Sequence, residues 1–171
     1  VALVTFPAAS VVFTSASDYG LSRTEYGGMF IPQAITAIGS ALLLQGKSGA
    51  ALEAMRLETD EVERLLGLAI VYHALGNSAE SDRALASLLQ GHGRAMPTDI
   101  AYVMAYRGEA DRAFEWLQKA VQYNDPDLTE IVFLPYFDNI RGDPRWLPFL
   151  RQIGRAPEQL AAIKFDVKLP Q

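Results

Sequence analysis

The sequence IAYVMAYRGEADRAFEWLQKA, residues 100–120, predicts two helices joined by a glycine turn. Gly108 is expected to end the first helix, because glycine adopts the left-handed backbone conformation at lower cost than other residues. A small residue stands seven positions before Gly108 (Ala101) and another five positions after it (Ala113). Small side chains at these positions let the two helices approach closely, while large apolar neighbours fill the remaining volume.

The same frame of small and large residues occurs twice more, around Gly46 and Gly76. The three glycines are separated by 30 and 32 residues, which indicates that one structural unit is repeated three times. The other small positions of the frame are Gly39, Ala51, Ala69 and Ser81, and the large ones are Ile38, Met55, Leu68, Leu85, Ile100 and Leu117. A repeat of this length indicates stacked helical hairpins, because each hairpin leaves an apolar face that its neighbour covers.

The composition describes a globular chain with an acidic balance. Of its 171 residues 50% are hydrophobic, and 15 Lys and Arg against 20 Asp and Glu give a net charge of −5. Without a strongly basic stretch, nucleic acid is not an expected partner. The chain has no cysteine, which excludes disulfides and thiolate catalysis. It has only two histidines, which excludes multi-histidine metal sites. We expect neither a metal nor a cofactor.

The resemblance rests on two stretches of the chain. Residues 100–120, followed by Asp125-Pro126, resemble a tetratricopeptide repeat. FDNIRGDPRW (137–146) and LRQIG (150–154) are similar to the end-cap after the last such repeat in bacterial multidomain proteins, which often carry a cyclase, kinase or DNA-binding module upstream. The resemblance covers about residues 32–155. It departs from the family pattern at Glu58, where a small apolar residue is usual, and at Ser81, where alanine is usual.

The resemblance implies an all-α fold, a right-handed superhelical stack of about three helical hairpins with a helical cap. We expect a repeat domain over 31–155, made of units 32–61, 62–93 and 94–125 and a cap over 126–155. Residues 1–30 are expected to form an irregular or extended leader, and residues 156–171 a short helix and an extended tail. Pro32 should open the first helix, the glycines at 91 and 93 should break the fourth, and Asp143-Pro144 should start the cap helix.

The resemblance also implies that the first helix of each unit lines a concave groove. The inward positions are Gln33, Thr36, Ser40, Leu43, Glu63, Leu66, Ile70, His73, Thr98, Tyr102, Ala105 and Tyr106. We expect a protein or peptide segment to bind there, with Leu43, Leu66, Ile70, His73, Tyr102 and Tyr106 as contact residues. The two tyrosines bury area and keep a hydroxyl, although packing against a neighbouring helix explains them equally well. The Lys, Arg and Asn clamp that related domains use for C-terminal carboxylates is absent.

The leader suggests a further hypothesis. Val1–Thr14 is apolar and rich in residues that favour extended structure, as a groove ligand should be. It is too short to span a membrane, contains Pro7 and lacks basic flanks. We therefore expect no membrane span, and consider that the leader occupies the groove of its own chain or of a second copy, which would give autoinhibition or a homodimer.

Several other patterns have competing explanations. The Gly46-Lys47-Ser48 sequence lacks the upstream glycine and strand of a phosphate loop, so a hairpin turn explains it better. A hydrolase that uses His73 with a nearby serine (Ser40, Ser48 or Ser81) remains an alternative, although no Gly-x-Ser-x-Gly elbow is present. A purely architectural spacer is a third possibility.

The acidic run Glu58, Asp60, Glu61 and Glu63 lacks the ligand spacing of a calcium loop, and a solvated helix start is preferred. The expected function is a protein-interaction module of a larger bacterial signalling or regulatory protein, without catalysis. We expect it in the cytoplasm, with the periplasm as the alternative.

Overall fold

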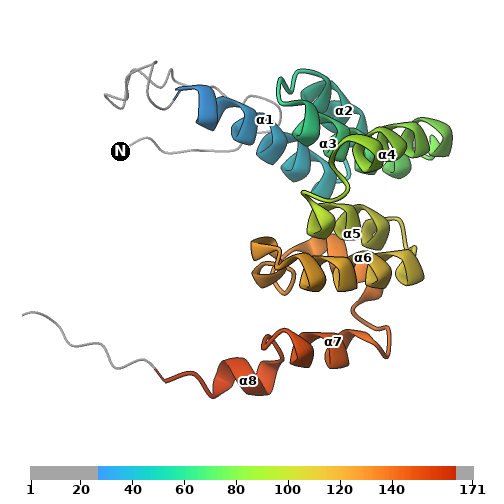
Figure 1. The fold of residues 1–171 in the computed structure, drawn as a ribbon. Coiled ribbons are helices and arrows are strands. Elements are labelled where there is room, and N and C mark those ends of the chain that lie inside the picture. Colours follow the sequence, from blue (N-terminus) through green and yellow to red (C-terminus); the bar gives the residue numbers. More distant parts are fainter. Residues whose placement is uncertain (1–26, 165–171) are drawn as a thin grey trace, which may run out of the picture.

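The computed structural model describes residues 27–164, with side chains from residue 35 onward, and this part of the chain contains helices and no β-strand. The predicted leader before residue 27 and the end of the predicted tail lie outside the described residues. In chain order the elements are α1 (Gly27–Leu44), α2 (Ser48–Arg56), α3 (Glu61–Ala74), α4 (Ser78–His92), α5 (Pro97–Tyr106), α6 (Ala110–Tyr123), the 3₁₀ turns η2 (Pro126–Thr129) and η3 (Pro135–Ile140), α7 (Trp146–Gln152) and α8 (Pro157–Ala161). Helices α1 to α6 pack as three consecutive hairpins that follow one another through the molecule, and α7 and α8 come last (Figure 1).

Each of the three predicted turn glycines ends the first helix of a hairpin with the same geometry. Gly46, Gly76 and Gly108 have φ angles of 73°, 74° and 74°. At Gly76 the N–H donates to the carbonyl of His73, and the next N–H, of Asn77, donates to the carbonyl of Tyr72; equivalent pairs of bonds occur at the other two turns. These bonds satisfy carbonyls that the helix end leaves free, as in the Schellman motif. The prediction of three glycine turns is confirmed.

The small positions of the frame are closed contacts between helices. Ala51, Ala69, Ala101, Ser81 and Ala113 are all 0% exposed. A Cβ added to Gly39 would lie 2.5 Å from Cε of Met55, the large residue of the same hairpin. Close helix packing therefore explains the frame, as predicted. Of the large positions, Ile38 and Leu68 are only half-buried, whereas the others belong to the core.

Two predicted helix starts are wrong, and one predicted helix end is confirmed. Helix α1 begins at Gly27 and Pro32 lies inside it, because a proline removes one helical hydrogen bond without forbidding the helix. Helix α4 ends at His92 with Gly93 as its C-cap, so the break falls at the predicted Gly-His-Gly sequence. Asp143 does not cap the last long helix. Its Oδ1 accepts the N–H of Arg145 at 2.9 Å within a turn, and α7 starts one residue later.

The cap region differs from the repeats because it contains two 3₁₀ turns before its helix. Phe137 and Ile140 of η3 are buried, and the side of η3 packs on α5. Trp146, Phe149 and Leu150 of α7 are buried as predicted, and the Phe149 ring meets Phe114 of α6 edge to face at 6.3 Å. In the cap, α7 therefore covers α6 of the last hairpin, and η3 covers α5 on the inward side.

Candidate functional site

The inward sides of α1, α3 and α5 meet around a small enclosed cavity. Its volume is about 10 Å³, roughly the room for one water molecule. It is lined by Thr36, Ser40, Leu43, Met55, Leu66, Gly67, Ile70, Val71, Tyr102 and Tyr136. Four of the six predicted contact residues are therefore brought together, and Leu43, Leu66, Ile70 and Tyr102 are each at most 9% exposed. Other residues of the described part of the chain therefore cover these four side chains, and little of their surface is left for a ligand.

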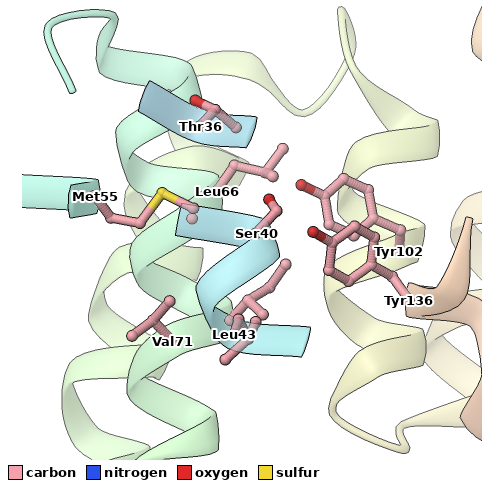
Figure 2. Close-up of a pocket in the computed structure, with 10 residues that line it drawn as sticks. Thr36, Ser40, Leu43, Met55, Leu66, Val71, Tyr102 and Tyr136 are labelled. Atoms are coloured by element: carbon pink, nitrogen blue, oxygen red, sulfur yellow. The ribbon is translucent and has the colours of Figure 1, made fainter. Parts of the chain in front are cut away.

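The residue that closes this cavity, Tyr136 of η3, was not among the predicted site residues. Its ring stacks on Tyr102 with centroids 4.9 Å apart and planes inclined by 29°. Figure 2 shows both tyrosine hydroxyls pointing toward Ser40 of α1. Burial raises the pKa of the Tyr136 phenol, and a hydrogen bond with Ser40 opposes part of that rise. A side chain from the cap thus reaches across the inward side to the first helix.

Tyr136 belongs to a row of rings that we call the aromatic ladder, made of His73, Tyr106, Tyr136 and Tyr102. His73 and Tyr106 meet edge to face at 6.1 Å, and Tyr106 and Tyr136 do so at 6.0 Å. His73, Tyr106 and Tyr136 are half-buried, so their outer edges reach the surface. The ladder joins the C-terminal ends of α3 and α5 to η3. The remaining two predicted contact residues, His73 and Tyr106, therefore lie at its accessible end.

The serines proposed for a hydrolase have other contacts. Ser81 is fully buried, and its hydroxyl donates to the carbonyl of Ala69 and accepts from Arg107 at 3.0 Å. Ser40 faces the cavity and Ser48 begins α2. Within residues 35–164 no hydrogen bond joins His73 to a serine, and its closest aromatic neighbour is Tyr106. These contacts favour packing roles for the groups that a hydrolase would use.

Acidic side chains gather beside the N-terminal ends of α3 and α5, and we call this cluster the acidic edge: Glu63, Asp99, Asp125 and Asp127. The Thr98 N–H donates to Asp125 Oδ2 at 3.0 Å, which ties the start of α5 to the residue before η2. Burial raises the pKa of Asp99 to about 7, and the charges of Asp127, Glu63 and Asp125 add to the rise. Burial also raises the pKa of Glu63, while a hydrogen bond with Thr36 opposes it.

The acidic run before α3 is only partly solvated. Asp60 caps the helix, and its Oδ1 accepts the N–H groups of Val62 and Glu63 at 2.9 and 3.1 Å. Glu58 is only 2% exposed, so the prediction of a solvated helix start is wrong for this residue. Its Oε2 accepts the Thr36 hydroxyl at 2.9 Å, and its Oε1 accepts the Asp60 N–H at 3.0 Å. These bonds compensate its burial and join α1 to the loop before α3.

Gly46 and Lys47 lie in the turn between α1 and α2, and Ser48 is the first residue of α2. Lys47 Nζ donates to Gln45 Oε1 at 2.8 Å. Over the described range, no helix has the length and apolar character needed to cross a membrane. In the same range, no three His, Cys, Asp or Glu side chains are placed to hold a metal ion.

Comparisons of the chain with protein-family models, with curated proteins and with solved structures each gave no match. The class of the protein therefore follows from its own geometry. Residues 27–164 form an all-helical protein of consecutive packed hairpins, with a cap that closes the inward side.

Proposed function

We propose that this chain is an interaction module that binds a protein or peptide segment over the aromatic ladder. The observation that carries the proposal is the row of half-buried rings from His73 through Tyr106 to Tyr136, held in place by ring contacts on three different elements. Partly exposed tyrosines are frequent at the centres of protein interfaces, because they bury a large area at low entropic cost and keep a polar group.

The repeated turn geometry supports a tetratricopeptide-type architecture for the three hairpins. The same glycine conformation and the same pair of backbone bonds recur at Gly46, Gly76 and Gly108. Each of these turns lies within a hairpin, so the three hairpins share one internal geometry, and stacks of similar hairpins present one side of their first helices as a binding surface. On this proposal the module serves a larger regulatory protein.

The proposed segment lies on the ladder and does not enter the cavity beneath it. A volume of about 10 Å³ admits no side chain, whereas the ring edges above it are accessible. An extended segment can place alternate side chains against successive rings. The leader, Val1–Thr14, is one such segment, and a homodimer through it is one form that binding could take.

The experiment is selection from a phage library of random peptides of about twelve residues on the full chain, an extended length that can cross several helices. Enriched peptides are then measured against Tyr106→Ala, His73→Ala and the control Tyr123→Ala. Tyr123 is a 41% exposed tyrosine at the end of α6, outside the ladder. We expect about tenfold weaker binding to Tyr106→Ala and His73→Ala and unchanged binding to the control. Peptides that bind all three variants equally, or no enrichment at all, would contradict the proposal.

A further inference from the structure

Among the residues that the structure describes, the four carboxylates of the acidic edge have no cationic partner. Ion pairs among the residues that the structure describes use other acidic side chains, such as Asp82, Glu109 and Asp143. The nearest basic group in the sequence, Arg64, donates instead to the backbone carbonyl of Glu58 at 3.0 Å. Like charges held together in a partly buried place repel one another, so this arrangement opposes folding unless something compensates it.

Two buried oxygen atoms at the edge also lack a hydrogen-bond partner within the described part of the chain. They are Oδ2 of Asp99 and Oγ1 of Thr98, adjacent residues in the first turns of α5. Thr98 is only 2% exposed, and its N–H already bonds to Asp125, another residue of the edge. Unsatisfied buried polar atoms are rare in folded proteins, and each calls for an explanation. Carboxylates accept hydrogen bonds and the Thr98 hydroxyl can accept as well as donate, so a group that carries several donors would suit the edge.

The acidic edge adjoins the aromatic ladder. Asp99 lies three residues before Tyr102 on α5, so both side chains project from the same side of that helix. The charges of Asp99 and Glu63 help to raise the pKa of the buried Tyr102 phenol, after the larger effect of burial. Asp127 is exposed, while Asp99 and Asp125 are half-buried, so the edge can be reached from solvent. The accessible rings of the ladder lie at the C-terminal ends of α3 and α5 and the edge at their N-terminal ends, so a segment that follows α5 from Tyr106 to Asp99, about two helical turns, would contact both.

We propose that the acidic edge binds the guanidinium or ammonium group of an arginine or lysine in the segment that lies on the ladder. The proposal rests on the proposed function and specifies its partner as a basic segment. Arginine fits best, because its planar fork supplies five donors that match carboxylate geometry, and its face also packs on aromatic rings. The net charge of −5 adds a long-range attraction for such a partner.

The test uses the full chain and synthetic peptides of about twelve residues in which arginine alternates with leucine and serine, matched by peptides with citrulline at each arginine. Citrulline keeps the shape and removes the charge. We expect the arginine peptide to bind about tenfold more tightly than the citrulline peptide at about 50 mM salt, and the difference to shrink at about 300 mM. Equal affinities for the two peptides would overturn the proposal.

Matched variants locate the effect on the chain. Asp99→Asn with Glu63→Gln should weaken the arginine peptide about tenfold and leave the citrulline peptide unchanged. The control, Glu53→Gln with Glu115→Gln, removes the same charge from exposed positions on α2 and α6 and should leave both affinities unchanged. An equal loss in the control would mean that only net charge matters, which also overturns the proposal.

Other occupants give distinct results. If the edge binds the chain's own leader through Arg23, then Arg23→Gln should raise the affinity for the arginine peptide, and the claim of a separate partner is wrong. If the edge binds a second copy of the chain, the wild type should have twice the monomer mass in solution. The double variant, Asp99→Asn with Glu63→Gln, should then have the mass of a monomer. Peptides that depend on the ladder but contain no Lys or Arg would refute this inference while leaving the proposed function intact.

Discussion

Two clusters of charged side chains lie partly buried in this molecule, and only one of them is balanced. Around Arg107, whose side chain is 9% exposed, the guanidinium donates to Glu109 at 2.6 Å, to Asp82 and to the Ser81 hydroxyl. Each charge there has a partner. At the acidic edge, four carboxylates converge on the start of α5, and the described residues supply no cation. The same fold thus buries charge in two opposite ways.

The difference concerns what each cluster contributes. The Arg107 cluster joins α4 to the turn between α5 and α6, so it fixes the second hairpin against the third. A buried charge contributes to a fold when its partners satisfy it, and it costs free energy when they do not. The acidic edge is therefore expected to lower the stability of the free protein and to be compensated when a ligand binds. Such local costs are characteristic of functional sites.

The largest effect is expected from Arg107→Ala, which breaks the balanced cluster. It removes a nearly buried cation that donates to the buried Ser81 hydroxyl and pairs with Asp82 and Glu109, so the free energy of unfolding should fall by about 2–3 kcal/mol. Urea denaturation measures the change. The control is Arg83→Ala, which breaks an exposed pair with Glu80 and should cost less than about 0.5 kcal/mol. Equal losses would mean that Arg107 behaves as an ordinary surface residue.

The next effect is expected from Asp99→Asn, which relieves the unbalanced cluster. In the folded state Asp99 keeps its proton up to about pH 7, while in the unfolded state it releases the proton near its ordinary pKa of 3.8. The folded protein should therefore lose stability as the pH rises from about 4 to about 7 and remain less stable above that range. Since Asp99 is partly exposed, we expect the variant to gain about 2 kcal/mol at pH 8 and little at pH 4.

The measurement is urea denaturation of the wild type and of Asp99→Asn at several pH values. Glu53→Gln, a change on an exposed side chain of α2, serves as the control and should leave the pH profile of the wild type unchanged. If Asp99→Asn instead lowers the stability at pH 8, then the carboxylate is compensated within the chain. In that case the contrast between the two clusters disappears.

The fold could be predicted from the sequence because its signals are local. Gly108 and the equivalent Gly46 and Gly76 predict a backbone conformation that other residues adopt at a cost. Ala101 and Ala113 predict a close contact between the two helices of one hairpin. Helix ends were predicted less well. Pro32 lies inside α1 and Gly91 inside α4, because a single such residue weakens a helix by a limited amount.

The candidate site could be predicted only in part because it depends on contacts between distant units. Leu66 and Tyr102 were placed on the inward side, and they line the cavity. Their cover, Tyr136, lies in η3, a short 3₁₀ turn of the cap, where no helical or strand periodicity shows in the sequence which way a side chain points. The acidic edge was missed for the same reason. Asp99 and Asp127 are separate surface-type residues in the sequence, and only the packing of η2 near α5 brings them together.

The smallest effect compares one buried hydroxyl from each cluster. Ser81 donates to the Ala69 carbonyl and accepts from Arg107, whereas the Thr98 hydroxyl has no partner among the described residues. Ser81→Ala should therefore lower the free energy of unfolding by about 1 kcal/mol, because it removes satisfied hydrogen bonds. Thr98→Val keeps the shape and the backbone bond to Asp125, and it removes a polar atom that burial penalises, so it should raise the free energy of unfolding by about 1 kcal/mol.

Urea denaturation at one pH measures both variants, and the opposite signs are the result that matters. If both variants destabilise the protein, the Thr98 hydroxyl is satisfied in solution, and a donor already reaches the acidic edge without any partner. If the signs are opposite, the Thr98 hydroxyl is unsatisfied in solution as well, and the acidic edge carries the uncompensated cost that separates it from the Arg107 cluster.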